Sequence, residues 1–264
     1  MSETLAIAIT GAGGRMGRRL VALVREADDL TLAAAVDPGH VGTDAGELAG
    51  VGPVGVSVTG DLTGRPDAVI DFSVPEAAAK LAAECGDRGI ALVEATTGLT
   101  DPQRQAVLDA GQTAPVVFAP SMSSAVNVAM KLVRDAGAAL RDAAGGCDVE
   151  IVERHHRYKE DAPSGTALKF GEVVAGAMGQ TRHVHGREGR TGQRPGGEIG
   201  YHALRLGDDV GQHTIAFGLM GETLEVTVRG QSRDSYALGA LAAARWVQGR
   251  PAGLYSMADV LGLD

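Results

Sequence analysis

One short run of the sequence gathers residue types that transfer protons and bind anions. Residues 153–168 read Glu-Arg-His-His-Arg-Tyr-Lys-Glu-Asp-Ala-Pro-Ser-Gly-Thr-Ala-Leu. Histidine titrates near neutral pH, so the pair His155 and His156 could deliver a proton to a bound substrate. Lys159, which follows the pair, would hold substrate charge and could share in the proton transfer.

The same run continues into the start of a predicted helix. Ser164 is suited to cap that helix, and the N–H groups of Gly165 and Thr166 would then form a site for an anion. A substrate carboxylate could bind there, with Lys159 as its counter-charge. The run therefore predicts a catalytic loop next to a carboxylate-binding helix start.

Two other interpretations of this run are a metal site and a polar loop without a ligand. Adjacent histidines point in different directions, and the sequence has neither an HExxH motif nor a cysteine cluster, so we predict no metal. A loop whose histidines only meet solvent would not need two histidines, a lysine and an anion-binding helix start together. The catalytic loop is the preferred interpretation.

A glycine-rich run joins a predicted strand to a predicted helix near the N-terminus. Residues 11–17 read Gly-Ala-Gly-Gly-Arg-Met-Gly. Glycines at this spacing let the backbone turn tightly and bring N–H groups against a pyrophosphate, and Asp37 ends the next strand, where it could bind a ribose 2′-OH. The alternatives are a strand-to-helix turn without a ligand and, for Asp37, a turn residue before Pro38 and Gly39.

The preference between the two nicotinamide cofactors stays open. The Asp37 carboxylate would repel a 2′-phosphate and so favours NADH, whereas Arg15 could offset part of that repulsion and admit NADPH. Two further predicted strand ends point to the same sheet edge, because ligands of open α/β sheets bind beyond the carboxyl ends of strands. They are residues 95–98 and 119–122, and taken alone they are also typical of loops that merely cap strands.

Composition limits the classes of function. The 264 residues are 44% hydrophobic and 22% charged, which excludes overall disorder, and the formal net charge of −9 argues against nucleic-acid binding. Cys85 and Cys147 are far apart and offer no metal or redox spacing, which favours a reducing compartment. Residues 1–10 lack the pattern of a signal peptide, and no stretch is long enough to span a bilayer. We therefore expect a cytoplasmic protein that binds neither nucleic acid nor a membrane.

The chain must position these motifs on two domains. In residues 1–126, short apolar runs alternate with helix-like segments, which predicts a Rossmann-type α/β domain with a doubly wound parallel sheet. The predicted strands are 5–10, 30–36, 68–72, 90–93 and 116–118, and the predicted helices are 15–27, 75–88 and 102–110.

Strands gather in the second part of the chain with few helices between them. Residues 127–233 therefore predict a second, α+β domain with an antiparallel or mixed sheet. Its predicted strands are 149–153, 199–206, 213–218 and 223–229, its helices are 127–140 and 166–178, and a Gly- and Arg-rich loop covers 185–197. The helix predicted at 235–248 should dock back, so that residues 234–264 complete the first domain.

With these motifs in this order, the chain resembles the 4-hydroxy-tetrahydrodipicolinate reductase family of bacterial lysine biosynthesis along nearly its whole length. The run His-His-x-x-Lys-x-Asp-x-Pro-Ser-Gly-Thr-Ala that begins at His155 is highly specific to that family. The resemblance implies reduction of 4-hydroxy-tetrahydrodipicolinate to tetrahydrodipicolinate, with a hydride from C4 of NADH or NADPH and loss of water. It also implies a homotetramer built through the sheet of the second domain, which would bind substrate and form the oligomer.

The resemblance also assigns roles to residues. It implies His155 as the proton donor and Lys159 as its partner. It implies His156, Gly165 and Thr166 as contacts to the cyclic dicarboxylate substrate. We expect Ser164, the predicted cap of the same helix start, to belong to this substrate-binding set. The implied cofactor residues are Gly11, Ala12, Gly13, Gly14, Arg15, Met16, Asp37, Ala95, Thr96, Thr97, Ala119, Pro120, Ser121 and Met122.

Some residues depart from the family pattern. Ala95 replaces a usual glycine where backbone should approach the nicotinamide, and Glu94 replaces a usually uncharged residue. Residues 123–127, Ser-Ser-Ala-Val-Asn, replace the usual Ser-Val-Gly-Val-Asn. A carboxylate facing the cofactor could support an imine reductase or amine dehydrogenase; the preferred interpretation is a surface or cap-bound Glu94, because strand-end charges often reach solvent. A non-catalytic nucleotide-sensing protein is a further alternative.

Overall fold

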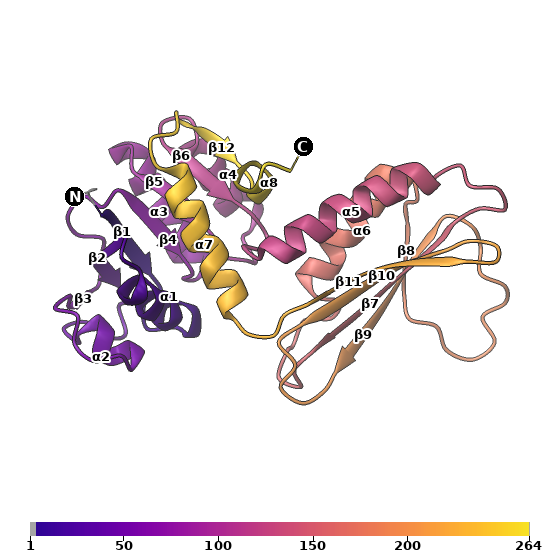
Figure 1. The fold of residues 1–264 in the computed structure, drawn as a ribbon, viewed down its shortest axis with the longest axis horizontal. Helices are drawn as coiled ribbons and strands as arrows, with labels where there is room; N and C mark the ends of the chain where they lie inside the picture. The colour runs from indigo at the N-terminus through magenta and orange to yellow at the C-terminus, as the bar shows by residue number, and fades with distance from the viewer. Residues whose placement is uncertain (1–3, 264) are drawn as a thin grey trace. The chain divides into compact units, whose positions relative to one another are not determined.

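The computed structural model describes residues 4–263, and within them seven parallel strands form one sheet. The strand order is β12-β6-β5-β4-β1-β2-β3, and it reverses direction at β1 (Figure 1). Ligands of doubly wound sheets bind at such a reversal, beyond the carboxyl ends of the strands. The strands are β1 (Leu5–Thr10), β2 (Leu30–Val36), β3 (Val58–Thr59), β4 (Ala68–Asp71), β5 (Ala91–Glu94), β6 (Pro115–Phe118) and β12 (Gly253–Tyr255).

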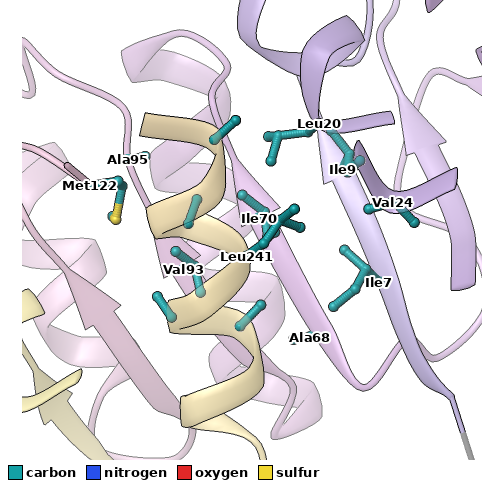
Figure 2. Packing of buried hydrophobic residues seen from close by; sticks show 14 of the residues in the cluster. Ile7, Ile9, Leu20, Val24, Ala68, Ile70, Val93, Ala95, Met122 and Leu241 are labelled. Atoms are coloured by element: carbon teal, nitrogen blue, oxygen red, sulfur yellow. The ribbon is translucent and has the colours of Figure 1, made fainter. Parts of the chain in front are cut away.

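Helices cover both faces of this sheet. On one face, Leu241 packs with Ile70 and Val93 of the sheet (Figure 2), and on the other, Cys85 joins a cluster with Leu92. Small side chains fill both layers, in keeping with an aromatic content of 3%. The helices of this part are α1 (Arg15–Glu26), α2 (Ala45–Ala49), α3 (Pro75–Arg88), α4 (Asp101–Ala110), α7 (Asp234–Val247) and α8 (Met257–Leu261).

The C-terminal segment belongs to the same compact unit, which comprises Met1–Ser124 and Asp234–Asp264. Within it, α7 packs on β4, β5 and β6, and β12 extends the sheet beyond β6. The Trp246 ring of α7 meets Tyr255 of β12 edge-on, with 5.1 Å between ring centroids. The Arg250 guanidinium lies 4.1 Å from the centre of the Trp246 ring.

The second unit, Ala125–Arg233, contains a mixed sheet in the order β11-β10-β7-β9-β8. β10 is antiparallel to β7 and β11, whereas β7, β9 and β8 run parallel. Two helices cover one face (Figure 1), and Phe170 and Phe217 are among the largest fully buried side chains there. The elements are α5 (Ser124–Leu140), β7 (Asp148–His155), α6 (Gly165–Met178), β8 (Arg182–His185), β9 (Glu198–Arg205), β10 (Gln212–Gly218) and β11 (Thr223–Arg229).

The predicted fold class is confirmed, and the long predicted elements lie within a few residues of their observed bounds. One difference affects the site: β7 runs on to His155 instead of ending at residue 153, so this histidine is held by sheet hydrogen bonds rather than by a loop. The predictions omitted α2, β3, β8, β12 and α8, which have two to five residues each. Such short elements hold too few residues to show a periodic pattern. None of the described helices has both the length and the apolar character needed to cross a membrane.

Gly17 lies where α1 crosses the loop after β1. A Cβ atom on Gly17 would lie 2.1 Å from the carbonyl oxygen of Gly11 and 2.6 Å from the Cα of Ala12, and neither backbone atom can move without opening the loop. We expect Gly17→Ala to lower the free energy of unfolding by about 3 kcal/mol, measured by urea denaturation followed by circular dichroism.

Gly176 is the matched control, because it is also a helical glycine. It is exposed on α6, and a Cβ there would meet no atom within 4 Å. Gly176→Ala should therefore raise stability by roughly 0.5–1 kcal/mol through helix propensity. Equal stability of Gly17→Ala and the wild type would contradict the tight contact.

Candidate active site

The predicted nucleotide-binding residues lie at one edge of the seven-stranded sheet. Gly11 follows β1, Asp37 follows β2, residues 95–97 follow β5 and residues 119–122 follow β6. All these strands are parallel, so their carboxyl ends meet at the same edge. The fold thus brings together segments that are far apart in sequence.

The glycine loop has the geometry of an anion cradle. Gly11 has a φ of +71°, and a Cβ there would lie 2.5 Å from the carbonyl oxygen of Phe72, so this position requires glycine. Gly14 caps α1 without a side-chain hydrogen bond, which leaves N–H groups of the first turn to point out of the helix. Arg15 is exposed at this end of the helix.

Asp37 lies beside this loop. Its carboxylate accepts hydrogen bonds from the N–H of Gly13 (2.9 Å) and the N–H of Gly39 (2.9 Å), and it lies 3.0 Å from Nδ1 of His40. Burial raises the pKa of Asp37, but the hydrogen bonds from His40, Gly39 and Gly13 outweigh it and lower the pKa below its usual range. Asp37 is therefore ionised at neutral pH and available to a ribose hydroxyl.

A hollow of about 420 Å³ opens at the reversal of strand order. Its lining includes Thr10, Gly11, Asp37 and Ser73, and this volume suits part of a cofactor. A dinucleotide fits three features of this edge. They are the uncapped start of α1, Gly11, which tolerates no Cβ, and this hollow.

Several predicted cofactor residues can offer only backbone atoms. Ala12, Ala95, Ala119 and Met122 are buried, with Met122 and Ala95 in the cluster that packs against α7 (Figure 2). The N–H of Ala12 already donates to the carbonyl oxygen of Val36 (3.1 Å), so Ala12 holds the loop to β2.

Glu94 is a correction to the sequence analysis. It is fully buried, and its Oε1 accepts the N–H of Thr96 at 2.7 Å, so it neither reaches solvent nor presents a charge to a substrate. The prediction was a surface or cap-bound residue. Its surface part is wrong because it assumed that the strand end is open, whereas the loop after β5 folds over it; the bond from the N–H of Thr96 agrees with the cap-bound part. The imine reductase or amine dehydrogenase hypothesis loses the residue that motivated it.

In the second unit, His155 is paired with a buried carboxylate. Nδ1 of His155 lies 2.5 Å from Oε2 of Glu153, which is 1% exposed. Glu153 also accepts the N–H of Ser164 (3.1 Å) and two N–H groups of Arg205 (2.9 and 2.8 Å). Burial raises the pKa of Glu153, but His155 and Arg205 outweigh it and lower the pKa to about 2.

This geometry assigns the two ring nitrogens of His155. Because Glu153 is ionised at neutral pH, Nδ1 carries a proton toward it and Nε2 is the atom left for proton transfer. Gly211, with a φ of +144°, lies against that side of the ring, since a Cβ on it would approach Nε2 to 2.9 Å. The His155 ring is thus fixed by a carboxylate at one nitrogen and by backbone next to the other.

Lys159 is tied to the same network. Its Nζ lies 2.7 Å from Oδ1 of Asp161, whose carbonyl oxygen accepts a hydrogen bond from Arg205 (2.6 Å). Burial raises the pKa of Asp161, but the hydrogen bond from Lys159 outweighs it and lowers the pKa. The contact with Asp161 therefore fixes the position of the Lys159 side chain in this network.

Ser164 builds the helix start. Its Oγ accepts the N–H of Ala167 (3.2 Å) and lies 3.0 Å from Nε2 of His213, and the residue is 2% exposed. Its hydroxyl is thus bonded within the protein, and the role of Ser164 in binding substrate stays a prediction. Gly165 is exposed and Thr166 is half-buried, so the first turn of α6 is open to an anion.

Sequence reasoning assigned no role to Glu153, Arg205 or His213. His213 is 3% exposed, and burial, followed by the charge of His155, lowers its pKa to about 4. It is therefore neutral at pH 7 and packs edge-on to the His155 ring, with 5.2 Å between ring centroids. The available signal was a polar residue at an inward position of an alternating strand, which needs a buried partner.

Two family models match the chain. One, described as dihydrodipicolinate reductase, N-terminus, matches residues 5–122, and the other, dihydrodipicolinate reductase, C-terminus, matches residues 125–261.

Individual relatives agree with these matches. The 4-hydroxy-tetrahydrodipicolinate reductase of Rhodopirellula baltica is 52% identical over 271 residues, covering 98% of this chain and 97% of the relative. That of an Anaeromyxobacter species is 50% identical over 264 residues, covering 97% of each. A solved structure of dipicolinate-bound dihydrodipicolinate reductase from a Paenisporosarcina species has a TM-score of 0.76 at 26% identity, covering 97% of this chain and 98% of that chain. The resemblance drawn from the motifs is confirmed: the chain belongs to the dihydrodipicolinate reductase family.

Proposed function

We propose that the protein reduces 4-hydroxy-tetrahydrodipicolinate to tetrahydrodipicolinate with NADH or NADPH, in the diaminopimelate route to lysine. The observation that carries this proposal is the pairing of His155 with the buried, ionised Glu153 beside the open first turn of α6. Membership of the dihydrodipicolinate reductase family supports 4-hydroxy-tetrahydrodipicolinate as the substrate. A nucleotide sensor would have no use for a histidine held in this way.

The first unit would hold the cofactor. Its glycine loop and the start of α1 would bind the pyrophosphate, and Asp37 would bind the ribose, favouring NADH through repulsion of a 2′-phosphate. When bound, the nicotinamide supplies the hydride. The backbone of residues 95–97 and 119–122 would complete the site.

The second unit would hold the substrate and supply the proton. Nε2 of the doubly protonated His155 ring donates it, while Glu153 stabilises this ring before the transfer and keeps Nδ1 protonated afterwards. His156, Lys159 and the N–H groups of Gly165 and Thr166 would bind the carboxylates. One hydride and one proton enter the substrate's conjugated imine system and one water leaves, so the reaction balances.

We also infer a cytoplasmic homotetramer that forms through the sheet of the second unit. Within the described residues 125–233, helices cover one face of that sheet, and Leu204 is 47% exposed on the other. An apolar side chain on an uncovered sheet face favours association with a second copy.

The decisive experiment is a turnover assay of the full chain. The substrate is made in situ by the synthase of the preceding step, and oxidation of NADH or NADPH is followed by the near-ultraviolet absorbance of the reduced nicotinamide. We expect rapid oxidation of both cofactors, with the lower KM for NADH because of Asp37. Cofactor binding without oxidation would contradict the proposed reaction, whereas a lower KM for NADPH would contradict only the role of Asp37.

A further inference from the structure

Three polar residues lie side by side at the carboxyl ends of neighbouring strands. Thr10 of β1 is directly opposite Asp71 of β4, which is directly opposite Glu94 of β5. The preceding residues Ile70 and Val93 face α7 (Figure 2), so the two acidic side chains point to the other face of the sheet, toward α3. Asp71 and Glu94 are both fully buried.

The hydrogen bonds of the two carboxyl groups are unequal. Asp71 accepts from the hydroxyl of Thr10, from the N–H of Ser73 (3.0 Å) and from the hydroxyl of Thr96 (3.0 Å). Glu94 accepts the N–H of Thr96 at Oε1 (2.7 Å), whereas no donor among the described residues meets its buried Oε2 with hydrogen-bond geometry. Asp71 is thus satisfied by three donors, whereas burial of the Glu94 carboxyl group with one donor disfavours a charge on Glu94.

No compensating charge pairs with Glu94 among the described residues around it. From α3, Cys85 faces the pair, and its pKa is raised to about 12 mainly by burial, so the thiol is neutral. From α4, the Arg104 guanidinium lies over the ring of Phe118, the cross-strand neighbour of Glu94 on β6. Burial, and then the charge of Asp71, raise the pKa of Glu94 to about 9.

We propose that Glu94 is protonated in the folded protein at neutral pH, that its Oε2–H is directed to the carboxyl group of Asp71, and that the pair positions the loop of residues 95–97. Both carboxyls hold Thr96, and the backbone N–H of Ala95 donates to the carbonyl oxygen of Asp71 (3.0 Å). Thr10 and Ser73, which line the hollow, bind the same Asp71. Only the link from this loop to the cofactor rests on the proposed function.

The stability of the protein should depend on pH because the pKa of Glu94 differs between the folded and the unfolded protein. A carboxyl whose pKa is higher in the folded than in the unfolded protein removes stability as pH rises from its ordinary value of 4.5 to about 9. Above that range Glu94 would carry a buried negative charge beside the Asp71 carboxyl group, which would loosen the hold on Thr96. Glutamine at position 94 is neutral at every pH and keeps a donor toward Asp71.

The first test is the melting temperature of the full chain as a function of pH, measured by calorimetry. The gap between Glu94→Gln and wild type should widen in favour of the variant by roughly 3–5 °C per pH unit between pH 6 and pH 9. Glu26→Gln, which removes an exposed carboxylate, should show a pH-independent difference from wild type. A pH-independent gap for Glu94→Gln would overturn the proposal.

Two further measurements test the protonation of Glu94 even if Glu94→Gln folds poorly. The infrared spectrum of the wild type at pH 7 should contain the C=O stretch of a buried protonated carboxyl, and Asp71→Asn should flatten the pH dependence of stability above pH 7.

In calorimetric titrations, the Kd of the wild type for NADH should rise roughly 10-fold as Glu94 ionises, and that of Glu94→Gln should not. A Kd that follows the same pH course in both proteins would overturn the positioning role, whereas failure of the proposed reaction would leave the melting and infrared results unchanged.

Discussion

The His155→Ala variant should reduce 4-hydroxy-tetrahydrodipicolinate roughly 10²–10⁴-fold more slowly than the wild type, with an unchanged Kd for NADH. The reason is that Nε2 of His155 is the proposed proton donor, while the proposed cofactor residues belong to the other unit. The measurement is kcat in the turnover assay, together with a calorimetric titration of NADH. Because alanine leaves the space of the ring empty, added imidazole should restore part of the rate.

His185→Ala is the matched control, since it removes an exposed histidine of the same unit. It should keep the kcat of the wild type. A wild-type rate in His155→Ala, or an equal loss in both variants, would remove His155 from the chemistry.

The Glu153→Gln variant should lose roughly 10²-fold in kcat, and the alkaline limb of its rate profile should move to lower pH. Glutamine has no charge to stabilise a protonated ring or to fix which nitrogen carries the proton. Glu153 acts through His155, so it is a positioning residue. The profile of kcat against pH is the measurement, because a purely structural defect would lower the rate without moving the limb.

The same substitution should cost stability. A carboxylate whose pKa is about 2 when folded and 4.5 when unfolded contributes stability that is complete above pH 4.5 and is lost as pH falls toward 2. That difference corresponds to about 3 kcal/mol at neutral pH. Denaturant titration of Glu153→Gln at pH 7 should show a loss of this order.

Glu150→Gln separates the two effects. Glu150 lies on the same strand, pairs with Arg187, Arg194 and His202, and has a pKa that these partners also lower to about 2 against the effect of burial. Its loss should destabilise the protein without moving the rate profile. A shifted profile in Glu150→Gln would show that the shift comes from stability alone.

Much of the fold could be predicted from the sequence, because long elements carry strong patterns. The Ala-rich helix at 75–88 and the strand at 5–10 each repeat their period over enough residues to be recognised. The pairing order of the strands, and the addition of residues 253–255 beyond β6, depend on contacts between distant segments. A local pattern does not contain that information.

The same distinction between local patterns and contacts of distant segments applies to the residues of the candidate site. His155 and Lys159 could be proposed from the sequence because a short run contains their whole motif, and the glycine loop could be proposed because backbone geometry restricts which residues fit. Arg205 and His213 were missed because they reach Glu153 and Ser164 only across the strands of a folded sheet. Glu94 was misplaced because its burial depends on a loop that closes over the strand end, and a sequence pattern shows the polarity of a residue but not what covers it.

The edge-on contact between Trp246 and Tyr255 gives the protein an intrinsic fluorescence probe. Trp246 is the single tryptophan of the 264 residues, and it lies on α7 against Tyr255 of β12. Fluorescence excited where only tryptophan absorbs therefore comes from the first unit alone, and it changes when α7 and β12 separate. Residues 125–233 contain no tryptophan and therefore do not contribute to this fluorescence. If the denaturation curves followed by fluorescence and by circular dichroism differ, the second unit, Ala125–Arg233, unfolds independently of the first. No added label is needed.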